Sequence, residues 1–120
     1  MGYKTLTVDT DPQAHLTSSL GVEGFENKET LYDCIVDGKS IKDVIVNVFP
    51  KLSVVPSNLS LTRLEPELNN MARREERLSI LMQNILKDYD FILVDTNPTI
   101  SVLNRNVIVF SDCLNIVTET

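Results

Sequence analysis

Two short apolar segments, each ending on an aspartate, constrain the fold of this chain more than any other feature. They are T-V-D-T-D-P-Q at residues 7–13 and Y-D-F-I-L-V-D-T-N-P at residues 89–98. β-Branched and aromatic side chains favour strands, so each segment is expected to contain a short strand that stops at its aspartate. In α/β proteins, ligands bind at the carboxyl ends of parallel strands. The sequence therefore predicts a polar site built on two strand ends.

The other segments predict an α/β fold. Strands are expected at residues 5–8, 52–55, 91–94 and 114–117, and the strand at 91–94 is expected to be buried on both sides. Helices are expected at residues 14–20, 31–36, 41–48, 58–70, 74–87 and 102–110, with Pro66 limiting the fourth. Strands that alternate with helices imply a parallel sheet covered by helices, here with about four strands in a single domain over residues 1–120.

The composition argues against several classes of protein. A formal net charge of -6 disfavours nucleic-acid binding by this chain alone, because such binding requires a basic face. No apolar run approaches the ~18 residues that a membrane span needs, and no signal peptide is expected, since acidic residues follow the first short strand at once. Cys34 and Cys113 lack metal-site spacing and are expected to be buried, reduced thiols. We expect a cytoplasmic protein.

Asp9 and Asp11 form an acidic pair after the first strand. Residues two apart on an extended chain point the same way, so both carboxylates could face a ligand beyond the strand end. Carboxylates in such a position can hold Mg²⁺ through water or orient an attacking water. The alternative interpretation is a polar loop whose aspartates cap the next turn.

Asp95 ends the second of the two segments. Four apolar residues followed by aspartate have the form of a Walker B strand, which delivers a carboxylate to the sheet edge near the hydration shell of Mg²⁺. Many buried strands end on aspartate, so this pattern alone is not specific.

Together these segments resemble the ParA family of P-loop ATPases, which includes the MinD-like proteins. V-D-T-D-P-Q-A-H-L-T-S-S-L-G at residues 8–21 resembles the family's switch segment, V-D-x-D-P-Q-x-N-x-T-x-x-L-G. T-L-Y-D-C-I at 30–35, L-S-V-V-P-S-N-L-S-L at 52–61 and Y-D-F-I-L-V-D-T-N-P are similar to T-L-Y-D-V-L, L-x-L-L-P-S-N-x-x-L and Y-D-Y-I-L-I-D-x-P-P. The resemblance runs through the whole chain. It implies an ATPase that partitions plasmid or chromosomal DNA or positions the division machinery.

The resemblance assigns roles to individual residues. Asp11 matches the switch aspartate that positions the hydrolytic water. Asp9 matches its partner at the strand end, near the Mg²⁺ water shell, and Asp95 matches the Walker B aspartate, which binds Mg²⁺ indirectly. Asn97 stands where the family usually has a proline, which puts the rigidity of that loop in question. His15 occupies a usual asparagine position and is expected to be a surface or helix-start residue.

The phosphate-binding part of the family's site is missing from this sequence. Neither G-x-x-x-x-G-K-[ST] nor G-x-G-x-x-G occurs, and the family's opening strand, K-G-G-V-G-K-T-T loop and helix have no counterpart here. We therefore expect an incomplete P-loop NTPase-type domain, an internal piece without the Walker A unit and the C-terminal portion. ATP and Mg²⁺ are the family's ligands, yet neither is expected to bind this chain tightly, and the piece alone is expected to be inactive.

The resemblance also bears on partners. In the family, a centromere-binding protein is the partner, and regions absent from this sequence bind DNA non-specifically. The family's Walker A strand lies between the Walker B strand and the strand that follows it, here 91–94 and 114–117. Without that central strand we expect an unpaired edge and an uncovered apolar face, and therefore self-association. A strand at 114–117 that moves into the vacant place is the alternative.

Two other functions remain open at this stage. The chain could be a non-catalytic module that binds a full-length relative or another partner. A response-regulator receiver also has an acidic pair and a later aspartate, but there the two are separated by roughly one βαβ unit, on the order of 30 residues. Here a whole extra strand lies between Asp9 and Asp95, and the receiver's late lysine is missing.

Overall fold

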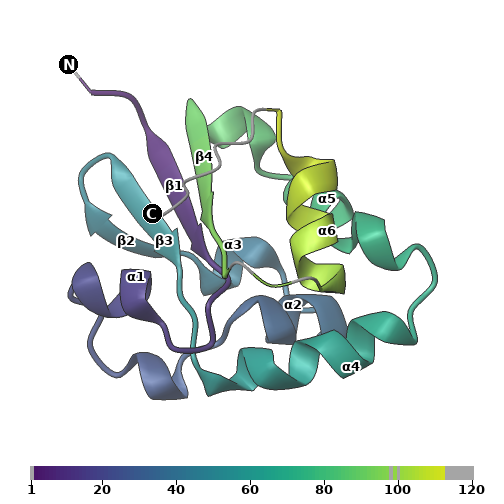
Figure 1. The fold of residues 1–120 in the computed structure, drawn as a ribbon. Helices are drawn as coiled ribbons and strands as arrows, with labels where there is room; N and C mark the ends of the chain where they lie inside the picture. Colours follow the sequence, from purple (N-terminus) through teal and green to yellow (C-terminus); the bar gives the residue numbers. More distant parts are fainter. Residues whose placement is uncertain (1, 98, 100, 113–120) are drawn as a thin grey trace, which may run out of the picture.

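A mixed four-stranded sheet organises the fold. The computed structural model describes residues 2–97, 99 and 101–112. The sheet contains β1 (Thr5–Asp9), β2 (Val46–Phe49), β3 (Leu52–Val55) and β4 (Phe91–Asp95) in the order β2-β3-β1-β4 (Figure 1). β1 is parallel to β3 on one side and to β4 on the other, whereas β2 is antiparallel to β3.

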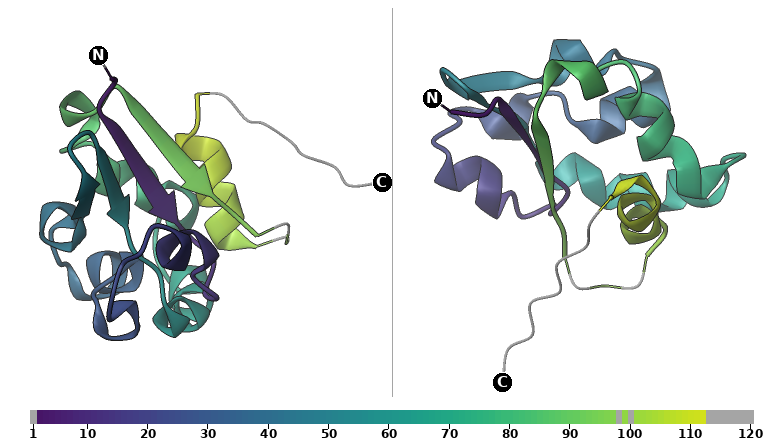
Figure 2. Two further views of the ribbon diagram at one scale, coloured as in Figure 1. Left: turned by 90° about the vertical axis from the view of Figure 1, so that its left-hand side faces the viewer. Right: turned by 90° about the horizontal axis from the view of Figure 1, so that it is seen from above.

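Helices cover the sheet unequally. They are α1 (His15–Ser19), α2 (Leu31–Asp37), α3 (Ile41–Val44), α4 (Leu64–Asn69), α5 (Arg77–Met82) and α6 (Val102–Phe110), with 3₁₀ turns at Phe25–Asn27, Leu59–Arg63, Arg74–Glu76 and Leu86–Asp88. Figure 2 shows α1 on one side of the sheet and α4, α5 and α6 on the other. The main core therefore lies on the face opposite α1. Its fully buried members include Leu6, Leu31, Leu64, Leu68, Leu78 and Met82.

The segment at 41–48 corrects one prediction. The expected helix ends at Val44, and Val46–Phe49 forms β2, which pairs with β3 through a hairpin around Pro50. The run V-I-V-N-V is rich in β-branched residues, which lose side-chain freedom in helices and pack well in strands. The sheet is consequently mixed and not wholly parallel.

The prediction of one continuous helix over residues 74–87 is also wrong. It is divided into a 3₁₀ turn, α5 and a second 3₁₀ turn. Asn106 from α6 is buried against the break, where its Oδ1 accepts from the Leu78 N–H at 2.9 Å and its Nδ2 donates to the Arg74 carbonyl at 2.7 Å. In an unbroken α-helix those two backbone groups would bond to each other. The side-chain amide of Asn106 thus takes the hydrogen bonds of both backbone groups, and the helix is interrupted there.

The strand at 91–94 exists, but the expectation that it is buried on both sides is wrong. Phe91 and Leu93 are 51% and 58% exposed, because β4 is at the edge of the sheet and no described helix covers their face. Ile92 and Val94 point the other way and pack on the core. The ring of Tyr3 lies edge-on to Phe91, with centroids 5.2 Å apart. The strand expected at 114–117 lies outside the described residues.

The remaining predicted helices are confirmed with small shifts in their ends. Gly21 and Gly38 adopt positive φ after α1 and α2, as expected of residues that end helices. Residues 58–70 divide into a 3₁₀ turn and α4, with Pro66 in the first turn of α4, where its missing N–H costs little. Cys34 is free and buried as expected, whereas Cys113 lies outside the described residues. No helix in the described part of the chain is both long and apolar enough to cross a membrane.

Candidate functional site at the carboxyl ends of the strands

The loops that follow β1, β3 and β4 meet at one edge of the sheet. β1 and β4 are aligned so that Asp9 lies opposite Asp95. Thr10 continues this pairing beyond the strands, because its backbone N–H and its Oγ1 both donate to the Asp95 carbonyl, at 3.1 and 2.6 Å. The residues that sequence analysis singled out, Asp9, Asp11 and Asp95, are therefore all at the same edge.

Asp9 is completely buried, and both oxygens of its carboxylate accept hydrogen bonds. Its Oδ2 accepts from the backbone N–H and the hydroxyl of Thr17, at 2.9 and 2.6 Å, and its Oδ1 accepts from the Asp11 N–H at 3.0 Å. A buried carboxylate is tolerated only when such donors replace water. These bonds hold α1 and the loop after β1 in a fixed position relative to the strand.

Thr17 and Ser57 connect this loop to the one after β3. Thr17 Oγ1 accepts from the Ser57 N–H at 2.9 Å, and Ser57 Oγ donates to the Asp11 carbonyl at 2.5 Å. Both side chains are completely buried. Sequence analysis did not single them out, although each is part of a segment that carried the family resemblance, Thr17 in residues 8–21 and Ser57 in P-S-N.

Asp11 is held by donors from two different loops. Its Oδ1 accepts from the Gln13 N–H at 3.0 Å and from Asn97 Nδ2 at 3.2 Å, while its Oδ2 lies 3.2 Å from His15 Nδ1. The Asp11 residue is only 7% exposed, but the His15 side chain is 81% exposed. His15 begins α1, as expected. The bond from Gln13 also means that Asp11 caps the turn that follows it. The alternative interpretation from the sequence, aspartates that cap the next turn, therefore describes part of the role of Asp11.

The turn that leads into α1 uses a non-glycine residue at positive φ. Ala14 has φ 58° and is completely buried, and its N–H donates to the Asp11 carbonyl at 2.8 Å. Left-handed backbone in a residue with a Cβ is uncommon and is found where the surrounding structure imposes it. The conformation fixes the direction in which the chain leaves Asp11.

Asp95 differs from the other two aspartates because it is exposed. In the part of the chain that the structure describes, no donor lies within hydrogen-bonding distance of its carboxylate. Partial desolvation, together with the negative charges of Asp9 and Asp11, raises the pKa of Asp95, and His15 opposes this rise. A cation beside Asp95 would relieve this repulsion.

Asn97 is held in place by the start of α6. The Asn104 side chain donates to the Asn97 carbonyl at 2.7 Å, while Ser101 caps the helix by accepting from the Asn104 N–H at 3.0 Å. Asn97, which stands where the family usually has a proline, is thus held by a hydrogen bond from α6. Asn97 is in turn able to reach Asp11.

The edge fits Mg²⁺ only in part. Mg²⁺ keeps several waters and is usually bound by one or two carboxylates together with substrate phosphates. Asp95 provides such a carboxylate, since it is exposed and lies close to the negative charges of Asp9 and Asp11. Among residues 2–97, 99 and 101–112, however, no group of His, Cys, Asp and Glu is arranged to enclose a metal by itself. The site could therefore hold Mg²⁺ through water only if a further group, such as a substrate phosphate, also bound the ion.

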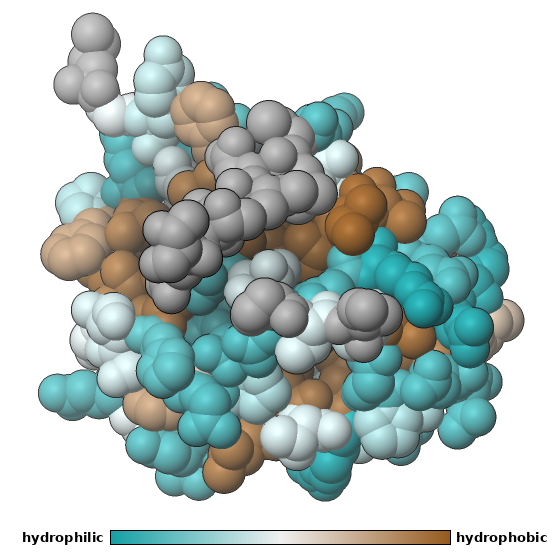
Figure 3. Space-filling view, viewed as in Figure 1, coloured by the Kyte–Doolittle hydropathy of each residue, from teal (hydrophilic) through white to brown (hydrophobic). Residues whose placement is uncertain are grey.

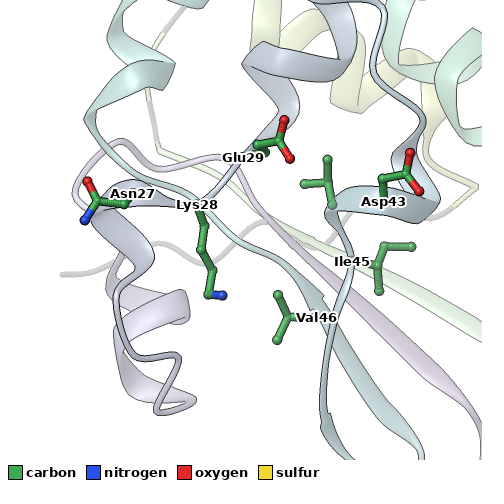
Figure 4. A pocket seen from close by; sticks show the side chains of 7 residues that line it. Asn27, Lys28, Glu29, Asp43, Ile45 and Val46 are labelled. Carbon is green, nitrogen blue, oxygen red and sulfur yellow. The ribbon is translucent and has the colours of Figure 1, made fainter.

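A separate pocket lies away from this edge. It has a volume of about 420 Å³ between the loop before α2 and the α3–β2 connection (Figure 4). Its polar side chains are Asn27, Lys28, Glu29 and Asp43, which carry one positive and two negative charges. None of the three aspartates lines it, and we assign it no role. Cys34 is not a nucleophile either, because burial and nearby carboxylates raise the pKa of its thiol to about 12.

Comparison with known sequences identifies relatives over the whole chain. The AAA domain family model AAA_31 matches residues 1–120. The sporulation initiation inhibitor protein Soj of Bacillus subtilis is 34% identical over 113 residues, which are 93% of this chain and 45% of Soj. The chromosome partitioning protein ParA of Caulobacter vibrioides is 31% identical over 116 residues, 94% of this chain and 43% of that protein. The chain thus spans less than half the length of these relatives.

Solved structures share the fold. A cobyrinic acid a,c-diamide synthase from Mycobacterium smegmatis with a bound ATP analogue and magnesium is 26% identical, with a TM-score of 0.85 over 92% of this chain and 45% of that one. A plasmid partition protein from Borrelia burgdorferi is 27% identical, with a TM-score of 0.78 over 92% of this chain and 50% of that one. The sequence relatives and the mixed sheet flanked by helices agree with the resemblance seen in the motifs. The chain belongs to the ParA/MinD-like family of P-loop ATPases.

Proposed function

We propose that this chain is the carboxylate-bearing part of a ParA-type partitioning ATPase, which in a longer protein binds MgATP and hydrolyses it to segregate plasmid or chromosomal DNA. One observation carries the proposal. Asp11 is buried at the sheet edge and held by donors from two loops, beside an exposed Asp95 with a raised pKa. A carboxylate whose pKa is raised, at the carboxyl ends of parallel strands, is typical of catalytic sites. The names of the relatives Soj and ParA agree with this role.

The proposal gives each aspartate a separate task. Asp11 positions the attacking water, and the bonds from Asn97 and Gln13 fix the direction of its carboxylate. Asp95 binds the water shell of Mg²⁺ when the nucleotide is present. Asp9, expected from its sequence position to lie near that shell, acts mainly by holding the loop, because its oxygens already accept from Thr17 and Asp11.

The same proposal predicts that the isolated chain does not hydrolyse ATP. Phosphoryl transfer depends on positioning and on neutralising the charge of the phosphates. No phosphate-binding loop occurs in the 120 residues, and three carboxylates alone repel ATP. The nucleotide site would be complete only when a strand, a K-G-G-V-G-K-T-T loop and a helix precede Gly2.

A second proposal concerns association. Tyr3, Phe91 and Leu93, here called the Phe91 patch, are large apolar side chains that are mostly exposed on one face of β4. Figure 3 shows that hydrophobic surface is present over the region of the sheet. Contiguous apolar surface of this kind favours association, so we propose that the chain self-associates through the patch. A non-catalytic module that binds a full-length relative would use the same surface.

Other partners follow from the family alone. A centromere-binding protein and DNA are proposed as partners of the longer protein, through regions beyond this sequence, and a cytoplasmic location belongs to the same proposal.

A fusion protein tests the ATPase proposal. The family's strand, K-G-G-V-G-K-T-T loop and helix are joined in front of Gly2, and ATP turnover is measured with and without Asp11→Ala. We expect turnover in the fusion, its loss in Asp11→Ala, and ATP binding that is largely unchanged. Asp43→Ala removes an exposed carboxylate outside the site and serves as the matched control. Loss of ATP binding in Asp11→Ala, or normal turnover, would show that Asp11 has another role.

A further inference from the structure

The start of α6 is bound by a carboxylate from another helix. Glu65, in the first turn of α4, accepts from the Val102 N–H through Oε1 at 2.5 Å and from the Leu103 N–H through Oε2 at 3.1 Å. The first N–H groups of a helix have no partner within the helix, and a negative charge beside them is favourable. One carboxylate, through both of its oxygens, therefore fixes the start of α6 relative to α4.

The same turn of α6 holds the backbone of the loop after β4. Asn104 Nδ2 donates to the Asn97 carbonyl at 2.7 Å and also to the Thr99 carbonyl. A side-chain amide has two N–H groups, one for each of these carbonyls. The Asn104 N–H is itself bonded to Ser101, which caps the helix. The position of the loop backbone thus depends on the position of the first turn of α6.

Asn97 connects this loop to the acidic edge. Its Nδ2 donates to Asp11 Oδ1 at 3.2 Å, and the other donor to that oxygen is the Gln13 N–H at 3.0 Å. Gln13 and His15 lie within four residues of Asp11 and belong to the same loop and the helix that follows it. Among the described residues, Asn97 is therefore the contact that orients the Asp11 carboxylate relative to another part of the sheet.

We infer that Glu65 is a positioning residue for Asp11, which acts through the start of α6, Asn104 and Asn97. The hydrogen bonds form an unbroken series from α4 to the Asp11 carboxylate. No basic side chain in the described ranges forms an ion pair with Glu65, so its charge acts on the N–H groups of α6. The consequence for ATP turnover rests on the proposed function, whereas the positioning itself is a property of the 120-residue chain.

A role limited to stabilising α6 makes a different prediction. A carboxylate that only caps the helix contributes to the free energy of unfolding, but its replacement leaves the surroundings of Asn97 unchanged in the folded state. A positioning residue changes both. The environment of the Asn97 amide in the folded chain therefore separates the two roles.

Nuclear magnetic resonance of the full, isotope-labelled chain without nucleotide provides this readout. Glu65→Gln keeps the length of the side chain and removes its charge and one of its two acceptors. We expect the Asn97 side-chain amide resonances to move towards those of Asp11→Asn, in which the carboxylate acceptor is absent, and the Asp11 carboxyl carbon resonance to move as well. Hydrogen exchange at Asn97 Nδ2 should become about tenfold faster or more. Glu67→Gln removes an exposed carboxylate from the same helix and should change none of these signals.

A second variant tests the route. Asn104→Ala removes the middle contact and should displace the Asn97 amide as Glu65→Gln does, while the double variant should show no further displacement, because both changes break one series. The inference would be overturned if Glu65→Gln lowered stability but left the Asn97 and Asp11 signals in place, if Glu67→Gln moved them equally, or if the two displacements simply added. These results would leave the ATPase proposal standing, since turnover of the fusion protein tests it separately.

Discussion

The hydroxyl of Thr17 donates a 2.6 Å hydrogen bond to Oδ2 of Asp9 and accepts one from the Ser57 N–H at 2.9 Å. All three residues are buried. A single hydroxyl thus joins the end of β1, the start of α1 and the loop after β3. It holds together the edge on which Asp11 is presented.

Replacing Thr17 should therefore destabilise the fold through a polar effect. Thr17→Val keeps the shape, but it removes one of the two donors to the buried Asp9 Oδ2 and leaves the Ser57 N–H without a partner, so we expect a loss of about 2–3 kcal/mol in the free energy of unfolding. Thr17→Ser keeps the hydroxyl and loses one methyl, for which we expect about 1 kcal/mol. Urea denaturation measures both. Equal losses would mean that the hydroxyl contributes nothing.

The charge of Asp95 should weaken the fold at neutral pH. Its pKa in the folded chain is raised above the ordinary value, chiefly by desolvation and then by Asp9 and Asp11. The folded state therefore favours the protonated carboxyl, and stability falls as the pH rises from the unfolded-state pKa through the folded-state pKa. Asp95→Asn should be slightly more stable than the parent chain near neutral pH, and this advantage should vanish in acid. Urea denaturation of both proteins across the pH range measures this difference. A lower free energy of unfolding for Asp95→Asn than for the parent chain at neutral pH would contradict the prediction.

The start of α2 provides a test with a built-in control. Thr30 Oγ1 accepts from the Tyr32 N–H at 3.2 Å, and Asp33 accepts from the Thr30 N–H at 2.7 Å. Ser40 precedes α3 but makes no such bond. Thr30→Ala should lower the free energy of unfolding by about 1–2 kcal/mol, whereas Ser40→Ala should lower it by less than about 0.5 kcal/mol. Similar thermal shifts for both would show that the cap does not matter.

Association through the Phe91 patch should depend on β4 and not on exposed apolar residues in general. Phe91→Ser with Leu93→Thr should shift the chain to monomer, because the apolar contact area is lost. Ile108→Ser with Val109→Thr removes side chains of similar size and exposure from α6 and should leave the oligomer intact. Light scattering at several concentrations measures the mass. A parent chain that is monomeric throughout would refute the proposed oligomer.

Local patterns predicted much of the fold and the location of the site. Strand ends at Asp9 and Asp95 were readable because short apolar runs stop at turn-forming residues, and α1 and α2 end at glycines as expected. The meeting of Asp9, Asp11 and Asp95 at one edge followed from the rule for parallel strands.

Long-range contacts account for the rest. No local pattern indicates that Asn106 would interrupt the helix at Leu78, because the two are far apart in sequence. Residues 44–48 have a helix-like spacing, yet pairing with β3 overrides it. The exposure of Phe91 and Leu93 depends on what lies over that face of β4, which the strand's own sequence does not encode. The hydrogen bonds of Thr17, Ser57 and Asn97 likewise appear only when three loops are brought together.

Calorimetric titration of MgATP into the 120-residue chain tests most directly whether the carboxylate edge is one half of a nucleotide site. Because the sequence has no phosphate-binding loop and the edge carries three carboxylates, we predict no measurable binding even at millimolar nucleotide. The fusion that carries K-G-G-V-G-K-T-T should bind MgATP under the same conditions. A saturable isotherm for the 120-residue chain, with an affinity in the tens of micromolar, would contradict this account.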